Sequence, residues 1–325
     1  MSQLDKIKSP IREELDQFES YFKDSMKTQI PLLDIILNYL VRRKGKQMRP
    51  MFVFLSARLL GETSQSTYTA ASLIELLHNA TLIHDDVVDK SYKRRGYFSI
   101  NALWKSKISV LVGDYLLSRG LLLSVRNKEY DLLEIVSNAV KEMSEGELMQ
   151  VKNNRKIYIT EEEYFKVIIK KTASLIASCT ACGARSVTDD QETIDTFHRF
   201  GEKIGTAFQI KDDLLDYERS GTIGKPAGND IKEKKVTLPL IYALNHSDQK
   251  EKKDIKKIFS RSKKNGGQVN KIIEFVRSKE GLEYARNKME TLKEEAIQML
   301  EPYSDNRPPY EALVALANFT VERSK

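Results

Sequence analysis

The sequence predicts an all-α protein, and three observations lead to this fold class. Apolar residues recur at three- and four-residue spacing in nearly every segment of the 325-residue chain, whereas sustained alternation of apolar and polar residues is hard to find. Only 15 Gly and 8 Pro are present, and helix-favouring residues are abundant. No linker, repeat or shift in composition divides the chain. We therefore predict a single domain over residues 1–325, built as one large helical bundle.

Clusters of turn-forming residues separate the predicted helices in order along the chain. They lie at residues 28–31, 61–65, 94–98, 153–160, 188–190, 220–230 and 265–267. These breaks predict about ten to twelve helices. The two helices that end near Asp89 and Asp216 are apolar on more than one face, which is typical of helices in the middle of a bundle.

The charge balance is moderately basic. The 53 Lys and Arg residues exceed the 46 Asp and Glu residues, and the net charge of +7 would attract polyanions such as nucleic acid, anionic lipid or a diphosphate. No basic stripe interleaved with aromatic residues is present, so we expect no nucleic-acid partner. The lysine-rich stretch from Lys250 to Lys264 is best interpreted as a solvated surface.

The amino-terminal residues 1–18 are charged throughout and lack the apolar core and cleavage site of a secretory signal. No uninterrupted apolar run approaches the roughly 18 residues needed to cross a bilayer. We therefore expect a cytoplasmic protein without a transmembrane segment, with at most a transient association with a membrane when the product is released.

Cys179 and Cys182 form a CxxC pair inside the helical stretch KTASLIASCTACGA. A zinc site needs four ligands, and the chain contains only 2 Cys and 4 His, so a structural zinc site is not expected. A redox-active pair stays open. The favoured interpretation is two small residues buried on one helical face.

Three aspartates end an otherwise apolar helix in the segment ELLHNATLIHDDVVDKSYKRRG. Asp85 and Asp89 share a helical face because they are four residues apart, and Asp86 lies beside them. Clustered carboxylates repel one another unless a cation neutralises them, and Mg²⁺ binds through a few carboxylates together with substrate phosphates. The segment predicts a magnesium site, although a single DDxxD also fits a solvated helix end.

A second DDxxD, formed by Asp212, Asp213 and Asp216, follows apolar residues in GTAFQIKDDLLDY. Two such clusters predict facing walls of one cavity, which is a stronger signal than either cluster alone. Arg forms paired hydrogen bonds with phosphate and Lys supplies a point charge, so basic residues near the clusters can hold diphosphates. The segments GKQMRP, RRG, KTA and GKPAGND provide Lys46, Arg49, Arg94, Arg95, Lys171, Thr172 and Lys225.

From Arg42 to Leu240 the chain resembles the trans-type polyprenyl diphosphate synthase family, which includes farnesyl, geranylgeranyl, octaprenyl and solanesyl diphosphate synthases. The resemblance implies an isoprenoid-synthase-type bundle with a central active-site cavity, a homodimer, and a Mg²⁺-dependent enzyme. Such an enzyme adds isopentenyl diphosphate to an allylic diphosphate, here farnesyl or geranylgeranyl diphosphate. The matching segments, in the family's order, are GKQMRP, ELLHNATLIHDDVVDKSYKRRG, GDYLL, GELMQ, KTASLI, GTAFQIKDDLLDY and GKPAGNDIKEKKVTLPLIYAL.

The resemblance also implies roles for individual residues. Mg²⁺ that bridges the allylic diphosphate would be held by Asp85, Asp86, Asp89, Asp212 and Asp216, with support from Asp213. The same diphosphate would be held by Arg94, Lys171, Gln209 and Lys225, with Thr172 and Lys235 nearby. Isopentenyl diphosphate would be held by Lys46, Arg49, His78 and Arg95. The released diphosphate, rather than a side chain, would accept the proton at the end of the reaction.

The sequence departs from the family pattern at two positions. The family commonly has GKRxRP and EGKxTLP, whereas this chain has Gln47 in the Arg position and Lys234 in the Gly position. Neither change removes a residue to which the resemblance gives a role.

Product length is predicted from the first aspartate helix. Thr81, Ala80 and Leu77 lie four, five and eight residues before Asp85, beneath the metal-binding face, where a growing chain would extend. An aromatic residue near this level blocks the chain in short-chain members of the family, so Ala80 predicts a long product of about C35 to C50, as made by octaprenyl-type synthases. The alternative is that Ala80 is only a tight helix contact.

Other functions stay open. The product could be shorter, as in a geranylgeranyl or farnesyl diphosphate synthase. A class I terpene cyclase shares the first DDxxD but has no need for an isopentenyl diphosphate site. A non-catalytic subunit of a synthase would be expected to have damaged aspartate motifs, and both motifs are intact here.

Overall fold

The computed structural model describes residues 2–42, 45–94, 96–154, 156–218, 228–261 and 264–322. Almost all regular structure in these residues is helical, which confirms the all-α prediction. The exception is a hairpin of two antiparallel two-residue strands, in which Lys93 pairs with Phe98 and Arg94 with Tyr97.

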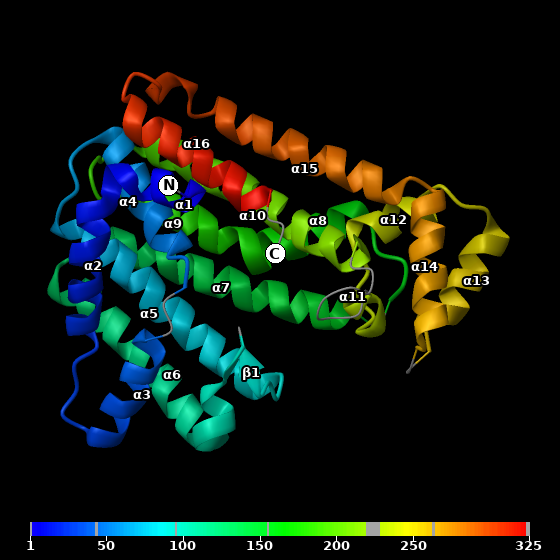
Figure 1. Ribbon diagram of the computed structural model, residues 1–325, viewed down its shortest axis with the longest axis horizontal. Coiled ribbons are helices and arrows are strands. Elements are labelled where there is room, and N and C mark those ends of the chain that lie inside the picture. Colours follow the sequence, from blue (N-terminus) through cyan, green and yellow to red (C-terminus); the bar gives the residue numbers. More distant parts are fainter. Residues whose placement is uncertain are drawn as a thin grey trace. The chain divides into compact units, whose positions relative to one another are not determined.

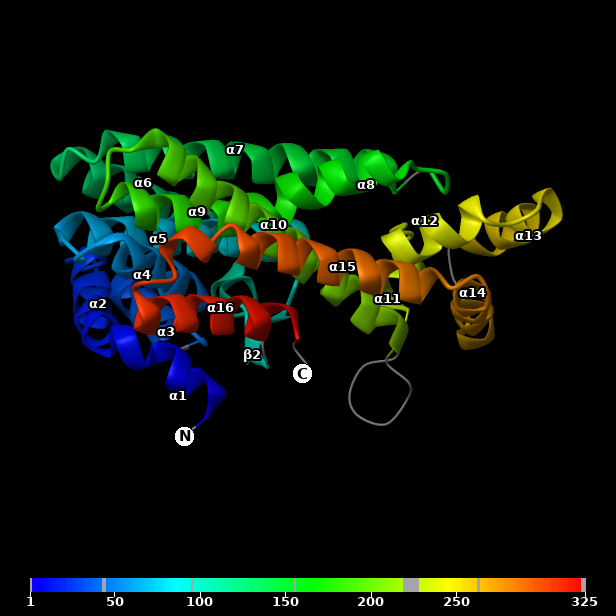
Figure 2. The same ribbon diagram turned by 90° about the horizontal axis from the view of Figure 1, so that it is seen from above.

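The α-helices and strand β1 are labelled in Figure 1, and strand β2 is labelled in Figure 2. Up to residue 153 they are α1 (Gln3–Lys8), η1 (Ser9–Ile11), α2 (Arg12–Ser25), α3 (Pro31–Val41), α4 (Met48–Leu60), α5 (Gln65–Val88), β1 (Lys93–Arg94), β2 (Tyr97–Phe98), α6 (Ile100–Arg126) and α7 (Tyr130–Asn153). They continue with α8 (Glu161–Ile168), the π-helical turn η2 (Ile169–Ala173), α9 (Ser174–Arg185), α10 (Gln191–Glu218), α11 (Asn229–Lys232), α12 (Leu238–Asn245), α13 (Gln249–Phe259), α14 (Gly266–Ser278), α15 (Gly281–Gln298), η3 (Glu301–Tyr303) and α16 (Arg307–Val321). Short helices such as α1 and α11 make the helices more numerous than the sequence breaks predict.

The chain divides into two compact units. Unit 1 contains residues 1–140, 178–198 and 302–316, and unit 2 contains residues 141–177, 199–301 and 317–325. The boundaries fall within α7, α9, α10, η3 and α16 rather than in linkers. The organisation as a single domain stays a prediction.

In unit 1, α5 and α6 run side by side (Figure 1). Leu76, Ala80 and Ile83 of α5 are buried together with Val112 and Leu116 of α6 in one apolar cluster. A glycine in α6 allows a close approach of the two helices, because a Cβ on Gly120 would lie 3.2 Å from Leu73 Cδ1 and 3.4 Å from Leu77 Cδ2. Residues on several faces of α5 are buried, which confirms the prediction of a central helix.

The start of α5 is fixed by a reciprocal cap. The Ser64 side chain accepts a hydrogen bond from the backbone of Thr67, and the Thr67 hydroxyl accepts one from the Ser64 backbone nitrogen at 3.1 Å. From this cap the helix runs without interruption to Val88, and Asp89 is its C-cap residue. The three aspartates of the first DDxxD therefore lie at the carboxyl end of a helix anchored at its other end.

In unit 2, α12 and α14 pack against α15, and Figure 2 shows these helices together with α13 near the beginning of α15. Their core includes Leu240, Ile241, Ile272 and Ala285, all buried. The same apolar cluster contains Ile210 and other residues of the carboxyl-terminal part of α10. Unit 2 thus holds the end of α10, which carries the second DDxxD, against an apolar core.

Two helical stretches of the described residues, Ile100–Arg126 and Glu161–Arg185, are long and apolar enough to cross a membrane by length and composition. Two thirds of the apolar part of Glu161–Arg185 is buried inside the protein, and α6 packs one face against α5. Core helices of soluble proteins pass the same test, so these stretches are weak evidence for a membrane span. The absence of a transmembrane segment stays a prediction.

Candidate active site

A π-helical turn carries two of the sequence-predicted site residues in unit 2. The helical stretch that begins after the Thr160 cap changes to a π-helix at Ile169–Ala173, which includes Lys171 and Thr172. Single π-turns inside α-helices occur frequently at functional sites.

Two glycines make room for this turn. A Cβ on Gly146 of α7 would lie 2.6 Å from the backbone nitrogen of Lys171, and a Cβ on Gly205 of α10 would lie 2.6 Å from the Cα of Ala173. Both distances are shorter than any real Cβ contact, so a larger side chain at either position would displace the turn. The turn is therefore held between two helices by direct backbone approach.

The second DDxxD lies in the last turns of α10, and its three aspartates differ in exposure. Asp212 is exposed, whereas Asp213 and Asp216 are buried. This difference follows from the helical repeat, because Asp213 and Asp216 lie on the side that packs against the core of unit 2.

A cavity of about 260 Å³ in unit 2 brings several predicted residues together. Asp212, Asp213, Lys171, Thr172, Gln209 and Lys235 all line it. The other lining residues are Gln150, Asn153, Asn154, Ile159, Tyr164, Val167, Ile168, Asp230, Val236 and Thr237. We call this cavity the aspartate pocket.

Both carboxylate oxygens of Asp213 accept hydrogen bonds. Tyr164 Oη donates to Asp213 Oδ2 at 2.7 Å, and Gln209 Nε2 donates to Asp213 Oδ1 at 2.8 Å. The carbonyl oxygen of Gln209 in turn accepts a hydrogen bond from the Thr172 hydroxyl at 2.8 Å. Asp213 is thus the centre of a network that joins α8, η2 and α10.

Asp216 is also engaged through both oxygens, but by backbone. Asn229 N donates to Asp216 Oδ1 at 3.1 Å and Asp230 N donates to Oδ2 at 2.9 Å. The Gly228 backbone nitrogen donates to the Asp216 carbonyl oxygen at 2.9 Å. Asp216 does not line the aspartate pocket. Asp216 therefore anchors the start of α11, and this contact holds Asp230 at the pocket wall.

Two carboxylates of the aspartate pocket have raised pKa values. Burial raises the pKa of Asp213 to about 7, and the nearby Asp230 carboxylate acts in the same direction, against the hydrogen bonds from Tyr164 and Gln209. Burial, and then the Asp216 carboxylate, raise the pKa of Asp230 to about 6, although Lys235 opposes this shift.

Among the described residues no group of three or more His, Cys, Asp or Glu side chains is arranged as a complete metal site. Mg²⁺ does not require one, because it commonly binds through one or two carboxylates together with water and substrate phosphates. A pocket with repelling carboxylates and an exposed Asp212 fits such a shared site. The donor set, all oxygen, also suits a hard divalent cation.

The basic residues of unit 2 form ion pairs at the pocket. Lys171 Nζ lies 2.5 Å from Glu147 Oε2 and also donates to Gln150. Lys235 Nζ lies 2.7 Å from Glu233 Oε2 and 3.7 Å from Asp230 Oδ1. About a third of each lysine side chain is exposed, and ion pairs at such positions are weak enough to exchange for a phosphate.

The first DDxxD belongs to unit 1. Asp85 and Asp89 are exposed, and the Asp89 backbone nitrogen donates to the Asp85 carbonyl oxygen at 2.8 Å. Asp86 is buried, and its Oδ1 accepts a hydrogen bond from Arg94 Nε at 2.8 Å. Two exposed carboxylates one turn apart fit the few-ligand binding of Mg²⁺, and Asp86 positions Arg94 next to them.

The residues predicted to hold isopentenyl diphosphate also lie in unit 1. Lys46 is exposed, His78 is half-buried in α5, and Arg49 forms a two-point ion pair with Glu75 at 2.8 and 3.3 Å. Gln47, which departs from the family pattern, adopts a left-handed backbone with φ of 56° and accepts a hydrogen bond from Lys8 Nζ at 3.1 Å. The side-chain amide of Gln47 thus forms a hydrogen bond within unit 1.

Two sequence-predicted residues, Arg95 and Lys225, lie outside the described residues. The chain-length residues Leu77 and Ala80 are buried in α5, and Thr81 is half-buried with its hydroxyl donating to the His78 carbonyl oxygen at 2.9 Å. Because the two aspartate clusters lie in different units, the expectation that they form facing walls of one cavity stays a prediction.

Among the lining residues of the aspartate pocket that sequence reasoning missed, Tyr164 and Asp230 carry ionisable side chains. Asp230 is part of the segment GKPAGND, so its position beside a basic segment was a usable signal. Tyr164 lies in an ordinary amphipathic helix, and nothing in its sequence neighbourhood distinguishes it from a core tyrosine.

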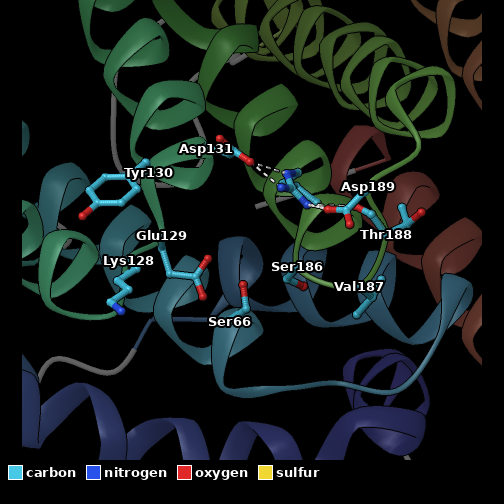
Figure 3. Close-up of a pocket in the computed structure, with 10 residues that line it drawn as sticks. Ser66, Lys128, Glu129, Tyr130, Asp131, Ser186, Val187, Thr188 and Asp189 are labelled. Carbon is cyan, nitrogen blue, oxygen red and sulfur yellow. Dashed lines mark hydrogen bonds and ion pairs between the residues drawn. The ribbon is translucent and has the colours of Figure 1, made fainter.

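A larger cavity of about 410 Å³ lies in unit 1. Figure 3 shows Asp131 and Asp189 on its wall, and Arg185 is ion paired with both. Lys128, Glu129, Tyr130, Ser66, Ser186, Val187 and Thr188 complete the lining. None of the sequence-predicted site residues lines this cavity, so size alone does not mark the site.

Cys179 and Cys182 are fully buried in unit 1, as the sequence favoured. Burial raises the pKa of both thiols, which keeps them protonated and unreactive.

Comparison with known proteins gives a consistent result. The family model described as polyprenyl synthetase matches residues 30–276. The chain is 34% identical over 324 residues to an octaprenyl diphosphate synthase of Escherichia coli K12, with 99% of each chain covered.

Solved structures agree in fold. A decaprenyl diphosphate synthase from Rhodobacter capsulatus is 32% identical with a TM-score of 0.91, and 99% of each chain is covered. A polyprenyl synthase from Caulobacter crescentus, in complex with calcium and isoprenyl diphosphate, is 30% identical with a TM-score of 0.88 over 99% of this chain and 98% of that one. A geranylgeranyl pyrophosphate synthase from Bacteroides thetaiotaomicron is 36% identical with a TM-score of 0.83 over 99% of this chain and 100% of the other.

Proposed function

Because the chain belongs to the polyprenyl synthetase family, we propose that it is a Mg²⁺-dependent enzyme that makes a long-chain product of about C35 to C50 from isopentenyl diphosphate and an allylic primer. That the chain is a polyprenyl diphosphate synthase, a trans-prenyltransferase, follows from the family and its full-length relatives. The aspartate pocket supports the proposal most directly, because it joins Asp212, Asp230, Lys171 and Lys235 in one cavity. Carboxylates for metal and lysines for phosphate are the groups that a diphosphate substrate requires.

Mg²⁺, when bound with the allylic diphosphate, neutralises the charge that develops on the leaving diphosphate. In this proposal the exposed carboxylates Asp85, Asp89 and Asp212 supply the protein's oxygen ligands, because they are accessible. Lys171 and Lys235 exchange their carboxylate partners for phosphate oxygens as the substrate enters. Gln209 and Thr172 hold the diphosphate from the pocket wall.

Asp86 orients the Arg94 side chain for binding the allylic diphosphate. The Nε of Arg94 is fixed by the buried Asp86 carboxylate, which orients the guanidinium and limits the entropy lost when it binds phosphate. Arg49, paired with Glu75, is oriented in the same manner for isopentenyl diphosphate, together with Lys46, His78 and Arg95.

Breaking the allylic C–O bond produces a carbocation, which the double bond of isopentenyl diphosphate then attacks. Water must be excluded because it would capture the cation and give an alcohol. The apolar residues of α5 next to the aspartates, including Ile83 and Ala80, provide surroundings without nucleophiles. The diphosphate released in the first step accepts the proton, so no side chain is proposed as the base.

The long product rests on Ala80. It is 2% exposed and packs in the cluster with Val112 and Leu116, so a large side chain at this position would displace these neighbours. In the proposal the growing chain passes this level of α5, and a small residue here leaves its path unblocked. Relatives of similar identity include a geranylgeranyl pyrophosphate synthase, so a shorter product is the second candidate. Mass analysis of the products of the unchanged chain separates the two candidates, and Ala80→Phe, which should give shorter products, tests whether this position limits the chain.

We also propose a homodimer. The helix α6 exposes many apolar side chains in unit 1, and such a continuous face is typical of an interface. The exposed residues of this face are Leu103, Val110, Leu111, Leu117, Leu121, Leu122 and Val125. Light scattering should give twice the mass of the chain, and Leu111→Asp with Leu122→Asp should reduce it to 37.3 kDa.

A cytoplasmic location, with transient contact to a membrane when a long product leaves, is proposed with the function. The experiment that tests the function is incubation of the purified protein with farnesyl or geranylgeranyl diphosphate, labelled isopentenyl diphosphate and Mg²⁺, followed by mass analysis of the chains. Products of about C35 to C50 are expected, and the Asp85→Ala variant should make none. Consumption of the allylic diphosphate alone would indicate a cyclase, and no consumption with any primer would indicate a non-catalytic subunit.

A further inference from the structure

Tyr164 does not belong to either aspartate cluster or to a basic segment, yet its hydroxyl contacts the centre of the aspartate pocket. The side chain is 3% exposed, and its Oη donates to Asp213 Oδ2 at 2.7 Å. We propose that Tyr164 is a positioning residue that acts through Asp213 on the pocket groups Gln209 and Thr172. The inference rests on the proposed function, because these two groups are taken to hold the allylic diphosphate.

The first step of the argument is the direction of the hydrogen bonds. Gln209 Nε2 donates to Asp213 Oδ1 at 2.8 Å, so the nitrogen side of the Gln209 amide faces Asp213. The Gln209 oxygen is then turned toward Thr172, whose hydroxyl donates to it at 2.8 Å. Asp213 thus fixes the orientation of the Gln209 amide, and the amide fixes the Thr172 hydroxyl.

The second step concerns Asp213 itself. Its side chain can rotate unless both oxygens are held, and Gln209 holds only Oδ1. The phenol of Tyr164 holds Oδ2 from α8, and the ring is fixed by its edge-to-face contact with Phe165, at 5.4 Å between ring centroids. Tyr164 is therefore the rigid end of the network.

The third step is that stability alone does not require this arrangement. A buried carboxylate loses hydration, and replacing both partners of a buried hydrogen bond by apolar groups of the same shape can be nearly neutral or stabilising. The network does, however, connect to the π-turn that carries Thr172 and Lys171, both of which line the aspartate pocket. Orientation of the pocket wall is what the buried network provides.

The test compares two Tyr→Phe variants. Tyr164→Phe removes one hydroxyl and keeps the buried ring. Tyr284→Phe is the matched control, because Tyr284 Oη also donates to a carboxylate in unit 2, that of Glu161 at 2.9 Å, and does not line the aspartate pocket. Thermal unfolding of both variants checks that each still folds.

Two measurements are made on the full chain. Calorimetric titration with inorganic pyrophosphate in the presence of Mg²⁺ should show roughly tenfold weaker binding for Tyr164→Phe and no change for Tyr284→Phe. Steady-state kinetics should show a similar fall in kcat/KM for the allylic diphosphate, while the KM for isopentenyl diphosphate stays within about twofold.

A double-mutant cycle separates positioning from a general structural effect. In a Gln209→Ala background, Tyr164→Phe should weaken pyrophosphate binding by no more than about twofold, because the group on which it acts is gone. The inference is wrong if the double variant binds pyrophosphate more weakly by the product of the two separate factors. It is also wrong if Tyr164→Phe and Tyr284→Phe bind pyrophosphate equally well. Failure of the unchanged chain to elongate any primer would instead reject the proposed function, so the two failures are distinguishable.

Discussion

Gly205 lies so close to Ala173 that a Cβ added to it would come within 2.6 Å of the Ala173 Cα. Because this neighbour is backbone, the contact cannot be relieved by a rotamer change, and Gly205→Ala must displace the turn that carries Lys171 and Thr172. We expect a loss of about 1–3 kcal/mol in the free energy of unfolding and a rise in KM for the allylic diphosphate.

The control for this substitution is Gly266→Ala. Nothing lies within 4 Å of a Cβ at Gly266, at the start of α14, so this change should not lower the free energy of unfolding and should leave KM within error. Chemical denaturation and steady-state kinetics measure the two effects. Unchanged stability and KM in Gly205→Ala would mean that the turn does not depend on this close approach.

Asp212 and Asp216 belong to one motif but should respond differently to replacement by Asn. Asp212 is exposed on the pocket wall, so Asp212→Asn should leave stability unchanged and lower kcat by at least about 100-fold through loss of an anionic ligand for Mg²⁺. Asp216 accepts two backbone hydrogen bonds, so Asp216→Asn leaves a buried N–H without its acceptor and should cost about 1–3 kcal/mol.

Urea unfolding and turnover at saturating Mg²⁺ check both halves of this prediction. Asp254→Asn, an exposed change on α13, is the control for charge alone. If Asp212→Asn unfolds more readily than Asp216→Asn, the assignment of ligand and anchor is reversed.

Lys234 occupies a position with φ of 61°, where side chains crowd the backbone. Lys234→Gly should therefore raise the free energy of unfolding by about 0.5–1 kcal/mol, after the greater freedom of glycine in the unfolded chain is subtracted. The side chain contributes one exposed hydrogen bond, from Nζ to the Ser260 carbonyl oxygen at 3.0 Å, which offsets little. Lys232→Gly, in helical α11, should have the opposite sign. Equal destabilisation by both variants would contradict this account.

The raised pKa of Asp230, about 6, makes stability depend on pH in a defined direction. Between its usual value near 3.8 and 6, the unfolded chain releases the proton first, so rising pH destabilises the folded protein over this window. Below pH 3.8 and above the folded value the contribution is constant.

Asp230→Asn removes this contribution. In the absence of divalent cations, the variant should gain stability relative to the unchanged chain as the pH rises from 4 to about 7. Denaturation of the unchanged chain and the variant at pH 4.5 and 8 measures the difference between their free energies of unfolding. If this difference is the same at both pH values, burial of the charged Asp230 carboxylate is not its cause.

The sequence predicted the helical fold and the two aspartate clusters because both depend on local spacing. Helical periodicity places Asp85 and Asp89 on one face, and the structure has them at the end of α5. The distinction between Asp212, Asp213 and Asp216 was not predictable, because it depends on Tyr164 and the backbone of Asn229 and Asp230, which only the tertiary fold brings to α10.

The Gly position of the family pattern is a further case. The sequence showed Lys234 where the family has Gly, but only the backbone reveals the left-handed conformation that makes Gly favourable there. Similarly, Gly146 and Gly205 read as ordinary helix residues, and their function as contact points for the π-turn requires the packed structure.

The contacts of Asp216 with residues 228–230 have a consequence for how this enzyme can vary in evolution and in engineering. These hydrogen bonds hold Asp216 and residues 228–230 together. The positions of Asp212 and Asp230 in the pocket wall are therefore maintained by contacts outside residues 219–227. Lengthening a connection whose ends are already held together costs only a small, slowly growing loop entropy. A peptide inserted between Glu218 and Gly228 should therefore cost little stability, because the contacts that hold the pocket wall lie outside the insertion.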